Sequence, residues 1–321
     1  MKVCLVSYDF WGYDAHIVEE LRRQGVQAMQ LNLGHFGHKN LAARAHNAFS
    51  KVFLGKNLKN QRRSELIFKK LKEAGIQDQV LTINPELFDR QTHEFIRQYA
   101  KKYTAYLYDS VARNPVSHLL DLFDEVYSFD REDCRNYGFK EITNYNYLDG
   151  RICGNKPEFD LIYLASIDDR LQHLPEITPE LFDLNLKPLY LISGKKAWKK
   201  NFGKLWSPKK WHSAVRYSKK KIGHDEIPGV YCRSRTVLDL VREGQNGLSF
   251  RFFEAMALRK KVVTNNANVL NYDFYNPNNI LVLTGDKKIN REFFETSYEE
   301  LPAEIYEKYT LKNWVKIVFN L

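Results

Sequence analysis

Arg251 and Glu254 stand three residues apart, just after a polar loop that contains Gly244 and Gly247. Helical spacing places the two charges on one face, near the start of a short helix. An arginine beside a helix N-terminus suits a phosphate, and a carboxylate one turn later suits paired hydroxyls such as those of a ribose. The pair predicts a nucleotide-sugar site; the alternative is that both charges only solvate a surface helix.

Two further cations follow expected strands in the same half of the chain. Arg170 comes after the apolar run 160–167, and Lys195 comes after the run 188–192. Cations at strand ends suit a diphosphate, although a single Arg or Lys is often only solvated. We read 230–241 as a short helix after a strand. The predicted donor-binding residues are Arg170, Lys195, Ser234, Gly247, Arg251 and Glu254.

Acid–base candidates gather in the first half of the chain. An apolar strand over 2–8 leads into a loop, and a helix over 15–24 follows, so Asp14 and His16 lie at the edge where such sheets bind ligands. Asp109 is the first residue after a strand over 103–108. Each of the three could act as a general base towards an acceptor hydroxyl. The alternative is that Asp14 caps the helix, that His16 is a solvated residue of its first turn, and that Asp109 caps a turn.

Composition narrows the class of protein. The chain has 321 residues, enough for two domains, and its hydrophobic fraction of 44% supports packed cores. A formal net charge of +10 implies anionic partners. The cysteines Cys4, Cys134, Cys153 and Cys232 are scattered, which argues against a zinc site and against a disulfide framework.

The cysteine pattern and the first residues lead us to expect a cytoplasmic protein. The first apolar run is too short for the core of a signal peptide, and no run approaches the length of a membrane span. Two basic segments could still hold the protein on an anionic membrane surface, as a peripheral protein on the inner face of the cytoplasmic membrane.

The first basic segment, 39–72, has apolar residues at helical spacing and one acid, Glu65. The second, 195–221, contains ten lysines and no acid, with Trp198, Trp206 and Trp211 interleaved. Such composition is typical of membrane-interface belts and of grooves for single-stranded nucleic acid. No nucleic-acid-binding motif accompanies it, so no nucleic-acid partner is expected. An ordinary packed surface helix remains the alternative for 39–72.

Strands and helices alternate along the whole chain, in two series separated by a polar stretch at 145–157. This alternation predicts an α/β fold. We expect an N-terminal domain over 1–150, a C-terminal domain over 151–300, and terminal helices over 301–321 that pack back towards the N-terminal domain.

Four stretches, in matching order, resemble bacterial glycosyltransferases of the GT-B fold that build lipopolysaccharide, capsule and exopolysaccharide. The first is Phe10-Trp11-Gly12-Tyr13-Asp14, and the second runs from Phe123 to Asp130. The third runs from Gln245 to Thr264, with a Gly-Leu-Ser-x-Arg-x-x-Glu core. The fourth is Tyr272-Asp273-Phe274-Tyr275-Asn276-Pro277-x-Asn279-Ile280. The last two stretches are the most specific.

The resemblance implies two Rossmann-like domains facing a central cleft. The C-terminal domain would hold a nucleoside-diphosphate sugar, with Glu254 on the ribose and Arg251 beside the diphosphate, and the N-terminal domain would hold the acceptor glycan. Retaining members have a second glutamate eight positions earlier, where this chain has Asn246, so the stereochemistry stays open.

The chain lacks the Asp-x-Asp clamp of the other large glycosyltransferase fold, and we expect neither a metal nor a cofactor. The predicted function is transfer of a hexose to a hydroxyl of a growing surface polysaccharide or lipopolysaccharide glycan. A sugar-nucleotide epimerase on the same fold and a nucleic-acid-binding protein using 195–221 are the alternatives.

Overall fold

The computed structural model describes residues 1–9, 11–34, 58–154, 156–195, 197, 199, 210–242, 244–283 and 289–321. The chain divides into two compact units. Unit 1 comprises Met1–Ile142 and Val315–Leu321, and unit 2 comprises Thr143–Trp314. Much of the two predicted basic segments, 39–57 and most of 196–209, lies outside the described residues.

Unit 1 is built on a six-stranded sheet in the order β2-β1-β3-β4-β5-β6, and every pairing in it is parallel. Runs of apolar residues make these strands because a parallel sheet is covered on both faces. The strands are β1 (Lys2–Ser7), β2 (Gln27–Asn32), β3 (Gln77–Ile83), β4 (Ala100–Leu107), β5 (Glu125–Ser128) and β6 (Lys140–Glu141).

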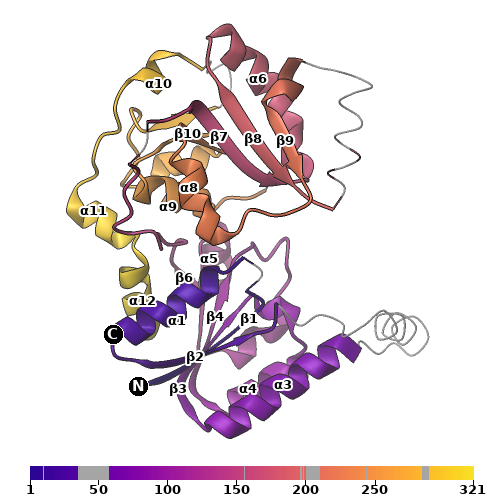
Figure 1. Ribbon diagram of the computed structural model, residues 1–321. Coiled ribbons are helices and arrows are strands. Elements are labelled where there is room, and N and C mark those ends of the chain that lie inside the picture. The colour runs from indigo at the N-terminus through magenta and orange to yellow at the C-terminus, as the bar shows by residue number, and fades with distance from the viewer. Residues whose placement is uncertain are drawn as a thin grey trace. The chain divides into compact units, whose positions relative to one another are not determined.

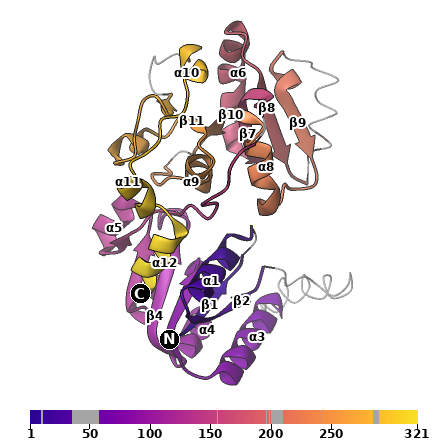
Figure 2. The same cartoon turned by 60° about the vertical axis from the view of Figure 1, so that its left-hand side comes forward.

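Helices cover both faces of this sheet (Figures 1 and 2). Right-handed crossovers put the helix after β1 and the helix after β2 on opposite faces, because those two connections run in opposite directions. One core cluster joins β1 and β3 to Ile67, Leu71 and Ile96. The helices are α1 (Tyr13–Arg23), α3 (Leu58–Ala74), α4 (Arg90–Arg97), α5 (Arg131–Tyr137) and the short η1 (Pro85–Leu87) and η2 (Ser117–Leu122).

Unit 2 repeats the plan with a second six-stranded parallel sheet, in the order β12-β11-β10-β7-β8-β9. Its strands are β7 (Phe159–Ser166), β8 (Pro188–Ser193), β9 (Val215–Ser218), β10 (Ser234–Asp239), β11 (Lys261–Thr264) and β12 (Ile280–Val282). Its helices are α6 (Leu174–Asp183), α8 (Ile227–Tyr231), α9 (Phe250–Ala257), α10 (Glu292–Glu295), α11 (Ala303–Lys308) and the short η3 (Asp169–His173), η4 (Lys210–Ala214), η5 (His224–Glu226) and η6 (Ala267–Asn271).

Two core clusters lie on the two faces of the unit 2 sheet. One contains Phe252, Phe253 and Met256 of α9, and the other contains Leu174 and Leu181 of α6. The last helix, α12 (Leu311–Phe319), begins in unit 2 and ends in unit 1. There Gln79 of β3 donates a hydrogen bond to the carbonyl of Val318 at 3.0 Å.

Each sheet has one topological switch point, where neighbouring strands send their connections in opposite directions. In unit 1 this point lies between β1 and β3, and in unit 2 it lies between β7 and β10. Open α/β sheets bind ligands in the crevice outside the carboxyl ends of such a pair of strands. The strand order therefore predicts one ligand-binding position in each unit, at the carboxyl ends of β1 and β3 and of β7 and β10.

Two sequence predictions were wrong. Residues 230–241 do not form a helix after a strand; the helix α8 comes first and the strand β10 follows. The cysteines also do not all remain free, because Cys153 and Cys232 form a disulfide that spans 79 residues. Their spacing in sequence gave no hint of this, since the segment before β7 and the end of α8 meet only in the fold. Cys4 and Cys134 are free.

Among the described residues, no helix is both long enough and apolar enough to cross a membrane.

Candidate functional site

At the switch point of unit 2, Asp168 follows β7 and is held by two arginines. Its carboxylate caps η3 and accepts from Nε of Arg170 at 3.0 Å and from Arg242 at 2.9 Å. Burial acts to raise the pKa of Asp168, but the two arginines outweigh it and the pKa is lowered. Arg170 thus lies at the predicted strand end, paired with a carboxylate. Arg242 carries a second positive charge there.

The carboxyl end of β10 is joined to the start of α9 through Asp239. This fully buried carboxylate accepts from Oγ of Ser249 at 2.7 Å and from Arg251 at 2.8 Å. Ser249 in turn caps α9 by accepting from the backbone N–H of Arg251. Burial acts to lower the pKa of Arg251, and the charge of Asp239 reverses that effect and raises it. Arg251 is therefore committed to an internal ion pair beside the helix N-terminus.

Glu254 also finds its partner inside unit 2. Its side chain is buried, with 1% exposure, and its Oε1 accepts from the hydroxyl of Tyr147 at 2.7 Å. Although Arg251 and Glu254 are one helical turn apart, they bind different groups. The structure does not bring them together as a pair.

Lysines extend the positive charge along the same edge of the sheet. Lys195 follows β8 and is exposed. Lys221 lies beyond the end of β9, and burial together with the charge of Lys195 lowers the pKa of Lys221. Two ammonium groups that repel each other are both stabilised by a shared anion.

The remaining two donor-binding predictions have different outcomes. Ser234 begins β10, so it lies at the opposite edge of the sheet from Arg170 and Arg251; it is buried, and its hydroxyl contacts the carbonyls of Tyr231 and Thr236 at 3.1 Å each. This placement is a correction, and it results from the misread strand. Gly247 lies in the loop before α9, where its carbonyl accepts from Asn266 at 3.1 Å.

In unit 1, Asp14 lies in the first turn of α1, beside the switch point. Its side chain is 3% exposed, and its Oδ1 accepts from the hydroxyl of Tyr108 at 2.7 Å. Burial and the neighbouring charge of Asp9 raise the pKa of Asp14 to about 7. Asp9 itself accepts from the backbone N–H of Ala15 at 3.1 Å. A carboxyl with a pKa near neutrality is suited to proton transfer.

A second carboxyl of this kind follows β3. Burial raises the pKa of Glu86 to about 7, and the charge of Asp109 adds to the rise. Asn114 bridges the two carboxylates, donating to Glu86 at 3.1 Å and to Asp109 at 3.3 Å. Asp109 is also 3.5 Å from Arg113. The predicted residue Asp109 therefore belongs to a cluster whose unusual member is Glu86.

His16 lies one turn into α1. Its Nδ1 is 3.5 Å from a carboxylate oxygen of Glu19, which lies one turn further along the helix.

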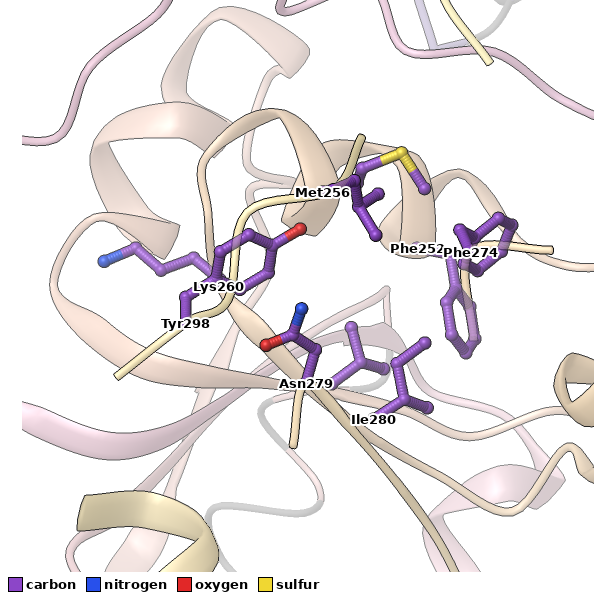
Figure 3. Close-up of a pocket in the computed structure, with 9 residues that line it drawn as sticks. Phe252, Met256, Lys260, Phe274, Asn279, Ile280 and Tyr298 are labelled. Carbon is purple, nitrogen blue, oxygen red and sulfur yellow. The ribbon is translucent and has the colours of Figure 1, made fainter. Parts of the chain in front are cut away.

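No group of three His, Cys, Asp or Glu side chains is arranged to hold a metal ion within the described part of the chain. A small cavity lies against α9 and is lined mainly by apolar side chains such as Phe252, Met256, Phe274 and Ile280 (Figure 3). Its volume of about 20 Å³ has room for roughly one water molecule. It cannot be a nucleotide site.

The sequence analysis did not identify several polar residues that lie near the switch points of the two sheets. Arg242, Lys221 and Asn266 follow strands in unit 2, and Glu86 and Tyr108 follow strands in unit 1. One signal was available: polar residues directly after buried strands. Strand order decides which of them lie at a switch point, and a single sequence does not give it.

Comparisons with known proteins agree with this architecture. Residues 190–305, all in unit 2, match a family model described as glycosyl transferase-like. No curated protein sequence matches the chain. Among solved structures, AviGT4, a glycosyltransferase involved in avilamycin A biosynthesis, is similar with a TM-score of 0.62 and 12% identity, covering 100% of this chain and 96% of that one.

Two more structures match over nearly their whole length. The lipopolysaccharide outer core galactosyltransferase WaaB has a TM-score of 0.55 at 10% identity, with 100% of this chain and 99% of that chain covered. HepE of Anabaena, solved in complex with UDP and glucose, has a TM-score of 0.53 at 10% identity, with 99% and 94% covered. The fold likeness spans both Rossmann-like units. It shows the GT-B fold, and the glycosyl transferase-like family match covers part of unit 2.

Proposed function

We propose that the protein transfers a hexose from a nucleoside-diphosphate sugar to a hydroxyl of a growing surface polysaccharide or lipopolysaccharide glycan. Unit 2 would bind the donor, and unit 1 would bind the acceptor. The observation that carries the proposal is the row of positive side chains at the carboxyl edge of the unit 2 sheet, around its switch point.

The donor diphosphate is assigned to Arg170, Arg242, Lys195 and Lys221. These cations lie after β7, β10, β8 and β9, four neighbouring strands of one sheet. The N-terminus of α9 opens at the same edge, and the positive end of the helix dipole favours a phosphate. The ion pair of Arg251 with Asp239 would hold this helix start in place, and Glu254 would take the ribose.

The cations would also stabilise the leaving diphosphate. Fixed positive groups and helix N-termini neutralise developing charge at no reorganisation cost, which is the task that Mg²⁺ performs in other enzymes. We therefore propose a metal-independent and cofactor-free reaction. This proposal holds for either stereochemical outcome, retention or inversion at the transferred sugar.

On the acceptor side, Asp14 and Glu86 are the groups best suited to accept a proton, because the pKa of each is raised to about 7. Asp109 would tune Glu86 through its charge, and His16 is a further candidate on α1. The setting we propose is the cytoplasmic face of a membrane, with lipid-linked glycan as the acceptor and no nucleic-acid partner.

The donor assignment is tested by thermal shift against a panel of nucleoside-diphosphate sugars, with and without EDTA. A ligand that binds only the folded protein raises the melting temperature. We expect at least one UDP-, GDP- or ADP-sugar to raise it, equally with EDTA present. The double variant Arg242→Gln/Lys221→Gln should lose most of this shift, whereas Lys101→Gln, whose lysine pairs with Asp78 in unit 1, should keep it.

The reaction itself is tested by incubating the protein and the stabilising donor with membrane glycolipid extracts. Transfer of labelled sugar into glycolipid is the expected result. Isomerisation of the donor in the absence of any acceptor would instead indicate an epimerase, and absence of any response to the whole donor panel would contradict the proposal.

A further inference from the structure

Unit 2 has a recess at the edge of its sheet opposite to the predicted donor site. The recess has a volume of about 550 Å³ and lies at the amino ends of β7, β8 and β9. The parallel register places the starts of these strands at one edge, with Leu161 beside Pro188 and Tyr190 beside Val215. A cavity of this size is within the range of small-molecule sites.

Apolar side chains form the floor of the recess. Leu186 and Leu189 are buried, and Phe182 of α6 and Leu191 of β8 are half-buried beside them. Phe159, the first residue of β7, completes this surface. The Phe159 side chain is half-buried and packs against the core cluster that contains α9.

Three cations surround this floor. Lys187, Arg216 and Arg233 are all exposed. The ammonium nitrogen of Lys187 is 4.9 Å from the ring centroid of Phe159, and the guanidinium carbon of Arg233 is 5.3 Å from it. The apolar stems of such side chains can lie on an apolar surface while their charges face water.

The charge of this recess is not balanced by its own lining. None of the described residues that line it carries a carboxylate. Arg233 pairs with Glu158 at 2.9 Å, outside the lining, while Arg216 donates to the carbonyls of Ser213 and Val215 at 2.9 and 3.1 Å. An apolar floor with a cationic rim is complementary to a molecule that has an anionic head and an apolar body.

We propose that this recess binds an anionic lipid, with the phosphate against Lys187 and Arg216 and the first carbons of the acyl chains against Phe159 and the leucines. A free phosphate would gain nothing from the apolar floor, whereas a lipid uses both parts of the recess. The site faces away from the donor edge of the same sheet. It is independent of the proposed transfer reaction and would hold the protein on an anionic membrane.

The test is sedimentation of the full chain with phosphatidylcholine vesicles, with or without phosphatidylglycerol. We expect binding to the anionic vesicles alone, weakened at least tenfold in Lys187→Glu/Arg216→Glu. The control Lys312→Glu/Lys316→Glu makes two charge reversals as well, at exposed positions of α12, and should bind within twofold of the wild type. If the charge reversals lower the melting temperature, the milder Lys187→Gln/Arg216→Gln should still weaken binding severalfold.

Three results would overturn the proposal. The first is unchanged vesicle binding in both double variants of Lys187 and Arg216. The second is an equal loss in the Lys312→Glu/Lys316→Glu control, which would indicate a response to net charge only. The third is full competition by soluble glycerol phosphate at the same phosphate concentration, which would indicate a plain phosphate site. Donor-induced thermal shifts should be unchanged in these variants, so a failure here is distinguishable from a failure of the proposed reaction.

Discussion

The hydroxyl of Tyr108, at the end of β4, donates a hydrogen bond of 2.7 Å to Asp14 at the start of α1. The two residues are separated by 94 positions in the sequence, and the bond crosses the switch point of unit 1. This hydrogen bond opposes the effect of burial on the pKa of the Asp14 carboxyl. Burial and Asp9 raise the pKa of Asp14, while this hydrogen bond lowers it, and the balance is about 7.

Tyr108→Phe should raise the pKa of Asp14 further. The hydroxyl that is removed stabilises the ionised carboxylate by donating a hydrogen bond to it. The change is measured directly by NMR titration of the Asp14 carboxyl. If Asp14 is the acceptor-side base, the acidic limb of the pH–rate profile should move to higher pH by the same amount. Tyr137→Phe, at an exposed tyrosine of unit 1, is the control and should leave both curves unchanged. A carboxyl titration that does not move would contradict the assigned contact.

Asp14→Asn should stabilise the protein at high pH. The carboxyl titrates near 7 in the folded chain and near 3.9 when unfolded, so the folded state holds the extra proton between these values. Stability from this group is therefore fully present below about pH 4 and falls as the pH rises to 7. The variant should be more stable than the wild type at pH 8, by up to about 4 kcal/mol, and equal to it near pH 4.

The measurement is urea unfolding of both proteins at several pH values. The difference between them isolates Asp14 from Glu86, whose pKa is raised in the same direction. An Asp14→Asn variant that is less stable than the wild type at pH 8 would show that the carboxylate is better solvated than its burial indicates.

The sequence predicted the apolar strands and the α9 region well, because parallel strands covered on both faces read as apolar runs and because Ser249 is a good helix cap. The same property misled the reading of 230–241. A strand buried on both faces cannot be told from a short buried helix by its periodicity. Ser234 was therefore placed at the wrong edge of the sheet.

The side-chain pairings could not be predicted, because they depend on strand order and on contacts between distant segments. Spacing placed Arg251 and Glu254 on one helical face, yet Asp239 binds one and Tyr147 binds the other. Glu86 gave no signal either, because the pKa of its carboxyl is raised only when the fold half-buries it near Asp109.

Arg251→Met should cost about 3–5 kcal/mol of stability, because it leaves the fully buried Asp239 without its charge partner. Within the described part of the chain, Oδ2 of Asp239 already has no hydrogen-bond partner. The double variant Arg251→Met/Asp239→Asn should therefore recover much of the loss. Urea unfolding of the two single variants and the double variant gives the coupling energy, and losses that simply add would contradict a direct ion pair.

Breaking the disulfide should destabilise unit 2. Cys153 and Cys232 close a loop of 79 residues, and opening a loop of that length typically costs about 2–4 kcal/mol. Cys153→Ser should melt at a lower temperature than the wild type and should not respond to added reductant. Cys134→Ser, at a free cysteine of unit 1, serves as the matched control and should keep the reductant response. A wild type whose melting temperature ignores reductant would rule out this bond in solution.

Tyr147→Phe should lower the stability of unit 2 and, at the same time, raise its affinity for the nucleotide-sugar donor. The hydroxyl of Tyr147 donates to Oε1 of Glu254, so it competes with the ribose hydroxyls that we propose this carboxylate binds. Removing it costs a hydrogen bond to a charged group, about 1.5–3 kcal/mol, so the melting temperature without ligand should fall. The released oxygen should bind the donor more tightly, so the thermal shift caused by a nucleoside-diphosphate sugar should increase. Glu254→Gln should reduce that shift, since an amide accepts less strongly. If Tyr147→Phe weakens donor binding as much as Glu254→Gln does, the two residues act together on the donor and do not compete.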